Sequence, residues 1–231
     1  MSWVKGVAGS SIGAKSIMAV TGLLLYGFLI AHLSGNLLIY QGPDATNAYA
    51  VNLRQLPFGL LWIARIGLIV IFAAHILTGI RLTLQNRRAR PNAYAHSSTI
   101  KATVASRSMI DTGMLVLVFL VYHLAHFTWH MFYFDESFVL PGGPIDVYRM
   151  VVTSFQNVWI AGSYIVAMIL VGLHLSHGIA SFFQTLGFHH SKYNGLIRHG
   201  GQVLAWGIAL GNITIPLAVL SGFITLIPRT V

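Results

Sequence analysis

Five long apolar runs, separated by short polar segments, dominate the pattern of this chain. An α-helix needs about 20 consecutive apolar residues to cross the hydrocarbon core of a bilayer, and each run is at least that long. Turn-forming residues at 41–44 (QGPD) and 141–144 (PGGP) mark two of the breaks. The pattern predicts an all-α integral membrane protein with transmembrane helices over residues 16–40, 58–84, 108–134, 156–186 and 202–227.

The composition agrees with a membrane protein. Only 8% of the 231 residues are charged and 55% are hydrophobic, whereas an ordinary soluble domain carries about 25% charged residues. With so few charges, a soluble fold of this size could not keep its surface in water. We find no low-complexity tract and no convincing internal repeat, so a single membrane domain over residues 1–231 is expected.

The basic residues, which give a formal net charge of +9, cluster in the short loops. There they indicate membrane orientation rather than binding of nucleic acid, because cytoplasmic loops carry an excess of Lys and Arg. One predicted side holds only Arg54, Arg65, Arg149 and Arg229. The opposite side is therefore expected to be cytoplasmic, with the N-terminus inside and the C-terminus outside. It holds Lys5, Lys15, Arg81, Arg87, Arg88, Arg90, Lys101, Arg107, Lys192 and Arg198.

Histidine supplies the candidate chemistry, because the chain has 11 histidines and no cysteine. The lack of cysteine excludes disulfides, thiolate ligation of haem and an iron–sulfur cluster held by this chain alone. An imidazole in hydrocarbon is costly unless it has a partner. For any one histidine, an interhelical hydrogen bond explains its position about as well as ligation does. The histidines inside the runs are His32, His75, His123, His126, His130, His174 and His177.

Depth sorts four of these histidines into two layers. At about 1.5 Å per residue, His32 and His123 lie roughly 25 Å from the predicted cytoplasmic face. His75 lies roughly 15 Å from that face, and His174 lies at a similar depth. One pair per layer, facing across a bundle of the first four helices, is what two bis-histidine haems need. Nearby glycines leave room for a macrocycle, although close helix packing explains each at least as well: Gly27, Gly35, Gly79, Gly172 and Gly178.

Two His-x-x-His pairs leave a choice of ligand, since residues three apart share a helix face. They are His123 with His126 and His174 with His177. Zinc is the rival interpretation, and it is disfavoured because no carboxylate or cysteine lies near either pair. His130 is expected near the outer surface. The remaining histidines are expected in cytoplasmic loops: His96, His189, His190 and His199.

Four histidine segments occur in order along the chain, at 27–33 (GFLIAHL), 72–79 (FAAHILTG), 119–123 (FLVYH) and 173–178 (LHLSHG). Together they resemble the cytochrome b membrane-anchor subunit of succinate dehydrogenases and fumarate reductases. The likeness is to the single-polypeptide, five-helix, dihaem branch and covers essentially the whole chain. The segments 11–15 (SIGAK) and 32–37 (HLSGNL) are similar to that branch in particular.

The resemblance implies His75 and His174 as axial ligands of an inner (proximal) haem b, and His32 and His123 as ligands of an outer (distal) haem b. These are the pairs that depth also gives. It implies two cytoplasmic partners, a flavoprotein with covalent FAD and an iron–sulfur subunit with three clusters. The chain would anchor them in a bacterial plasma (inner) membrane and transfer electrons to or from a quinone, typically menaquinone. Whether this heterotrimer assembles into a higher oligomer is left open by the sequence.

One position departs from the resemblance, because some dihaem fumarate reductases carry a glutamate where this chain has Gly172. That glycine argues against a carboxylate proton path like theirs. Candidate quinone-binding residues are Ser34, Asn36 and Arg54, although helix capping and interfacial hydrogen bonding are the favoured explanations. The alternatives are a fumarate reductase cytochrome b working in the opposite direction, a cytochrome b of a hydrogenase or formate dehydrogenase, and a proton-coupled transporter lined by histidines.

Overall fold

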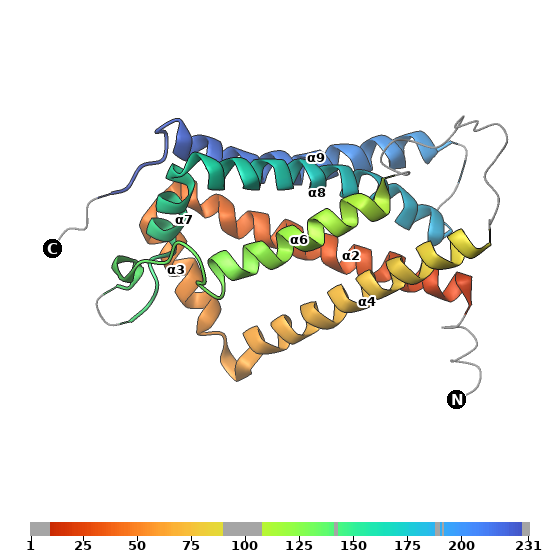
Figure 1. The fold of residues 1–231 in the computed structure, drawn as a ribbon, viewed down its shortest axis with the longest axis horizontal. Helices are drawn as coiled ribbons and strands as arrows, with labels where there is room; N and C mark the ends of the chain where they lie inside the picture. The colour runs from red at the N-terminus through yellow and green to blue at the C-terminus, as the bar shows by residue number, and fades with distance from the viewer. Residues whose placement is uncertain (1–9, 90–107, 141–142, 188–189, 191, 228–231) are drawn as a thin grey trace. The chain divides into compact units, whose positions relative to one another are not determined.

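The computed structural model describes residues 10–89, 108–140, 143–187, 190 and 192–227. Within these residues, five helices are long and apolar enough to cross a membrane, which confirms the predicted fold class (Figure 1). They are α2 (Ser11–Asn36), α4 (Leu60–Arg88), α6 (Met109–Phe127), α8 (Val158–Thr185) and α9 (Asn194–Leu220). The 3-10 turn η1 (Leu37–Gln41) extends α2, and η2 (Pro57–Gly59) precedes α4.

The end of α6 differs from the prediction, because the helix stops at Phe127 and not at residue 134. The amide nitrogens of Thr128 and Trp129 both donate to the carbonyl oxygen of Leu124, at 2.9 and 2.8 Å, which ends the regular ladder. His130 then adopts a φ of 53°, which a right-handed helix does not contain. The prediction was wrong because apolar and aromatic residues continue past the last turn, and apolarity does not specify backbone conformation.

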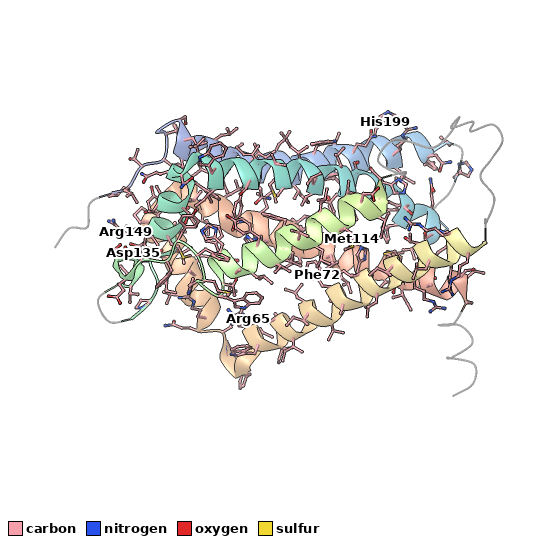
Figure 2. All side chains as sticks on the ribbon, viewed as in Figure 1. Arg65, Phe72, Met114, Asp135, Arg149 and His199 are labelled. Atoms are coloured by element: carbon pink, nitrogen blue, oxygen red, sulfur yellow. The ribbon has the colours of Figure 1, made fainter. Side chains whose placement is uncertain are left out.

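The bounds of α9 also differ, since it begins at Asn194 rather than at residue 202. His199 therefore lies on this helix and not in a loop, as Figure 2 shows. One of the glycines that weaken the apolar pattern here serves packing, since a Cβ on Gly201 would lie 2.9 Å from Cγ2 of Ile179 on α8. At the other end, Gly222 has a φ of 76° and terminates α9 before the predicted residue 227.

Two short helices were not predicted. α3 (Pro43–Arg54) and α7 (Val147–Gln156) lie in the segments interpreted as loops, and they contact each other (Figure 1). The Asp146 side chain caps α7 by accepting from the amide of Arg149 at 3.0 Å. Asn47 of α3 donates to Asp146 at 2.9 Å and accepts from the amide of Tyr148 at 3.1 Å. Asn47 thus joins the two short helices at the N-terminus of α7.

Contacts divide the chain into two compact units, and each of the five long helices contributes to both. Unit 1 comprises residues 1–28, 64–113 and 173–206, and unit 2 comprises residues 29–63, 114–172 and 207–231. Unit 2 has a core of buried aromatic and aliphatic residues from η1, α7, α8, α9 and the segment that follows α9. Its members are Ile39, Tyr148, Val152, Phe155, Ile160, Ala161, Tyr164, Ile215, Val219 and Ile224.

The charges of the described residues differ between the units. Unit 2 contains Asp44, Asp135, Glu136 and Asp146 with only two basic residues, Arg54 and Arg149. Arg149 and Asp135 are labelled in Figure 2. Unit 1 contains Asp111 and the larger basic set: Lys15, Arg65, Arg81, Arg87, Arg88, Lys192 and Arg198. The other basic residues used to predict orientation, Lys5, Arg90, Lys101, Arg107 and Arg229, lie outside the described residues.

Candidate functional site

The first candidate site lies in unit 1, where His75 of α4 faces His174 of α8. Their ring centroids are 6.4 Å apart and their planes are inclined by 74°. The hydroxyl oxygen of Thr21 on α2 lies 3.1 Å from Nδ1 of His75. In the same way, the hydroxyl oxygen of Thr112 on α6 lies 3.4 Å from Nδ1 of His174. The structure thus brings the predicted inner pair together and gives each ring a hydroxyl partner that the sequence pattern did not indicate.

Two glycines beside these threonines make the approach of the rings possible. A Cβ on Gly22 would lie 3.4 Å from Cε1 of His75, and one on Gly113 would lie 3.2 Å from Cε1 of His174. A side chain at position 113 would therefore press on the ring of His174, and one at position 22 would just touch the ring of His75. Neither glycine was among those expected to leave room for a cofactor.

The glycines that were singled out have other surroundings. A Cβ on Gly35 would lie 2.7 Å from the ring of Tyr49, and one on Gly79 would lie 3.1 Å from Cε of Met18, so both allow close helix packing. A Cβ on Gly27 or Gly178 would meet nothing within 4 Å. Close helix packing, the alternative explanation given for these glycines from the sequence, accounts for Gly35 and Gly79.

The second candidate site lies in unit 2, where His32 of α2 faces His123 of α6. Their ring centroids are 5.8 Å apart and their planes are inclined by 86°. Aromatic rings surround His123, with Phe119 and Phe127 at 5.8 Å and Tyr164 at 6.0 Å between centroids. The Nδ1 atom of His123 is buried and has no hydrogen-bond partner among the residues that the structure describes. The predicted outer pair is therefore also brought together, in an apolar setting.

His126 has a different environment from His123, although they are three residues apart. Its side chain is almost fully buried, at 2% exposed. Nδ1 lies 3.0 Å from the hydroxyl of Tyr164, and Nε2 lies 3.1 Å from the hydroxyl of Ser154. The ring also stacks on Phe127 with centroids 4.0 Å apart. Both nitrogens have protein partners, so His126 is a hydrogen-bonded core histidine and leaves no nitrogen for a ligand.

Both facing pairs fit a bis-imidazole metal. Bonds from a metal to imidazole nitrogen are about 2 Å long, so two rings on opposite sides of one iron have centroids about 6 Å apart. The observed separations of 6.4 and 5.8 Å bracket that value. Among the described residues, no group of three or more His, Cys, Asp or Glu side chains is gathered as a zinc site would require.

The three candidate quinone-binding residues are not joined by any interaction within the described part of the chain. The Ser34 hydroxyl donates to the carbonyl oxygen of Ile30 at 2.9 Å, within its own helix. The Asn36 amide donates to the Asn212 side chain on α9 at 3.3 Å. Structural hydrogen bonding, the favoured explanation at the start, describes both contacts, and the quinone assignment stays a prediction.

His130, which was expected near the outer surface, lies in the turn after α6. Burial and the positive charge of Arg54 lower the pKa of His130 below its ordinary value. Its ring stacks on Phe134 with centroids 4.6 Å apart. His130 therefore belongs to an aromatic segment, and it faces neither candidate pair in the described contacts.

These features define a class, an all-helical multi-pass membrane protein with two facing histidine pairs in apolar surroundings. Comparison with family models, curated proteins and solved structures found no match for the chain. The function is therefore inferred from the two pairs and from the sequence motifs that contain them.

Proposed function

We propose that this chain is the cytochrome b membrane-anchor subunit of a succinate dehydrogenase. In this role it transfers electrons between an iron–sulfur partner subunit and menaquinone through two b haems. The observation that supports the proposal most directly is the geometry of the two histidine pairs, with centroids 6.4 and 5.8 Å apart. Two axial imidazoles occupy both open positions of a haem iron, which suits electron transfer rather than binding of a substrate to the metal.

The roles of the residues follow from their positions. His75 and His174 hold the inner haem, and His32 and His123 hold the outer haem. When bound, the two haems would act as one-electron carriers. The chain itself has no cysteine that could serve in redox chemistry. Each pair joins two different helices, so ligation also ties helices together within its unit.

The direction of electron flow is proposed as succinate oxidation. A charge that crosses the membrane field fully gains or loses about 2.3 kcal/mol per 100 mV, so electron transfer between haems along the membrane normal couples to that field. Such coupling can help the unfavourable reduction of a low-potential quinone by succinate. Gly172 stands where some fumarate reductases have a glutamate, which favours this direction over fumarate reduction.

The proposed partners are a flavoprotein with covalent FAD and an iron–sulfur subunit, bound on the cytoplasmic side of a bacterial plasma membrane. The N-terminus lies in the cytoplasm and the C-terminus outside. Most basic residues of the described part belong to unit 1, which agrees with a cytoplasmic location for the loops of that unit. Sizing of the detergent-solubilised complex distinguishes the proposed heterotrimer from a higher oligomer of it.

The first prediction concerns haem content. The purified chain is expected to contain two low-spin b haems, because each of the two pairs supplies a complete axial ligand set. A pyridine haemochrome assay against protein concentration measures the ratio. Imidazole planes inclined by 74° and 86° act almost equally on the two iron d orbitals of π symmetry, so the ferric haems should give highly anisotropic electron paramagnetic resonance signals.

A ratio of one or none would contradict the proposal, and the absence of haem together with histidine-dependent solute transport would favour the transporter instead. Rhombic signals of ordinary anisotropy at a ratio of two would show that haem binds with other ligand orientations.

The second prediction concerns docking of the soluble partners. Arg87 and Arg88 end α4 and are exposed, and Arg90 lies just beyond, outside the described residues. The segments 81–107 and 189–198 are expected to form much of the docking surface, because a soluble subunit needs polar contacts to hold a membrane anchor. Replacing the three arginines with glutamine should weaken co-purification of both soluble subunits most at low salt, because added salt screens the same contacts in the wild-type chain.

The matched control is Arg54→Gln, which removes a positive charge at the end of α3 in unit 2. Insertion with the N-terminus inside is checked first for each variant. Equal retention of the soluble subunits by the triple variant and the control at every salt concentration would show that the cluster only orients the helices.

A further inference from the structure

The hydroxyls of Thr21 and Thr112 contact the inner histidines in the same way. Thr21 Oγ1 donates to the carbonyl oxygens of Ile17 and Met18, at 2.7 and 3.2 Å, and lies 3.1 Å from Nδ1 of His75. The one proton of this hydroxyl is shared between the two carbonyls. Towards the imidazole, the oxygen can therefore act only as an acceptor, and Nδ1 of His75 must carry the ring proton.

Thr112 repeats this arrangement on the other side of the pair. Its Oγ1 donates to the carbonyl oxygens of Ser108 and Met109, at 2.9 and 3.2 Å, and lies 3.4 Å from Nδ1 of His174. A neutral imidazole with its proton on Nδ1 has its free lone pair on Nε2. Both rings are thus held in the tautomer that presents Nε2 to a metal between them.

The two threonines also occupy equivalent positions in a repeat of the sequence. The pattern Met-x2-Thr-Gly-x5-Phe-x3-His-Leu begins at Met18 on α2 and again at Met109 on α6. It ends in His32-Leu33 and His123-Leu124, so each copy contains one outer histidine. The eleven-residue step from threonine to histidine is about three helical turns, which places both on one helix face. The expectation that the chain has no internal repeat was wrong.

The partner helices carry a shorter repeat, His-x3-Gly-Ile, which begins at His75 on α4 and at His174 on α8. Each helix pair, α2 with α4 and α6 with α8, therefore contributes one inner histidine, one outer histidine and one Thr-Gly dipeptide. The contact from threonine to inner histidine stays within each pair. The same contact occurs in both copies of the repeat, which indicates a required interaction rather than a coincidence of packing.

We propose that Thr21 and Thr112 are positioning residues that fix His75 and His174 in the Nδ1-protonated tautomer and lower the reduction potential of the metal group held between them. This inference rests on the proposed function, because the group is the inner haem b. When the N–H that points away from the metal has a hydrogen-bond acceptor, the imidazole becomes a stronger donor to the metal. Hydrogen-bond partners of ligating histidines act in this way generally. A stronger donor stabilises ferric over ferrous iron and so lowers the potential.

The test uses the purified full chain with its haems and the variants Thr21→Val, Thr112→Val and the double variant. Valine keeps the branched shape and removes the hydroxyl. Both axial histidines are unchanged in the valine variants, so the haem should be retained. The matched control is Thr83→Val in unit 1, where the hydroxyl donates to the Gly79 carbonyl oxygen of its own helix, at 2.9 Å.

The readout is a potentiometric titration of the b-haem absorbance. The redox transition that is present in the wild-type chain and absent from the His75→Ala variant belongs to the inner haem. In the double variant, the ferrous-to-ferric ratio of the inner haem at a fixed potential should increase about tenfold. This corresponds to a reduction potential about 59 mV higher for one electron. The outer haem and the Thr83→Val control should not shift. Thr21→Ser with Thr112→Ser should restore the original potential, because serine returns the hydroxyl.

Two haems per chain with an unchanged inner potential in the double valine variant would overturn the inference and leave the proposed function intact. Loss of the inner haem in the valine and serine variants alike would also overturn it, because side-chain shape rather than the hydroxyl would then be required. Loss in the valine variant alone would support it. Wild-type chain without haem would overturn both the inference and the proposed function.

Discussion

Replacing His174 with alanine is expected to remove the inner haem and to lower the haem content from two to one per chain. The buried methyl group cannot replace an axial nitrogen, and His75 alone would hold the iron from one side only. His75→Ala should give the same result. His32→Ala or His123→Ala should remove the outer haem instead. The haemochrome ratio and the number of waves in a potentiometric titration measure each outcome.

The control for this series is His177→Ala. His177 is half-buried and lies three residues beyond His174, within the same His-x-x-His pair. It should retain two haems at their original potentials. Loss of a haem from His177→Ala but not from His174→Ala would show that the choice within this pair is wrong.

Replacing His126 with alanine is expected to destabilise the protein by about 3 kcal/mol while both haems stay bound. The change opens a cavity at an almost fully buried side chain and leaves the hydroxyls of Tyr164 and Ser154 without their ring partner. A hydrogen bond between membrane helices contributes only about 0.6 kcal/mol on average, so the cavity and the unsatisfied hydroxyls dominate the loss. Unfolding by sodium dodecyl sulfate, followed by circular dichroism, measures it.

Tyr164→Phe and Ser154→Ala separate the contributions, because each removes one hydroxyl and keeps the histidine. Each should cost about 1 kcal/mol or less, and neither should change the haem content. If the folded His126→Ala chain lost a haem while the His123→Ala chain retained two, the outer ligand would be His126 and not His123.

The sequence by itself determined the membrane class and the number of spanning helices. Both depend on the amount of apolar surface per residue, and this quantity is additive along the chain. The same quantity placed the ends of α6 and α9 wrongly, because helix ends depend on local hydrogen bonds such as those closed at Leu124 and on the φ of Gly222. The short helices α3 and α7 were missed for a related reason, since Asn47 and Asp146 read as loop residues until they are seen to join two helices.

The tertiary structure supplied a physical reason for choosing between two histidines on one helix face. His123 and His126 share a helix face, and only the positions of Tyr164 and Ser154 show that His126 has both nitrogens occupied. The Thr-Gly dipeptides at residues 21 and 112 were present in the sequence, but their meaning depends on rings that come from other helices. Periodicity along one helix predicts which side chains share a face. Which partner meets that face depends on contacts between residues far apart in the chain, and the packing of the helices decides it.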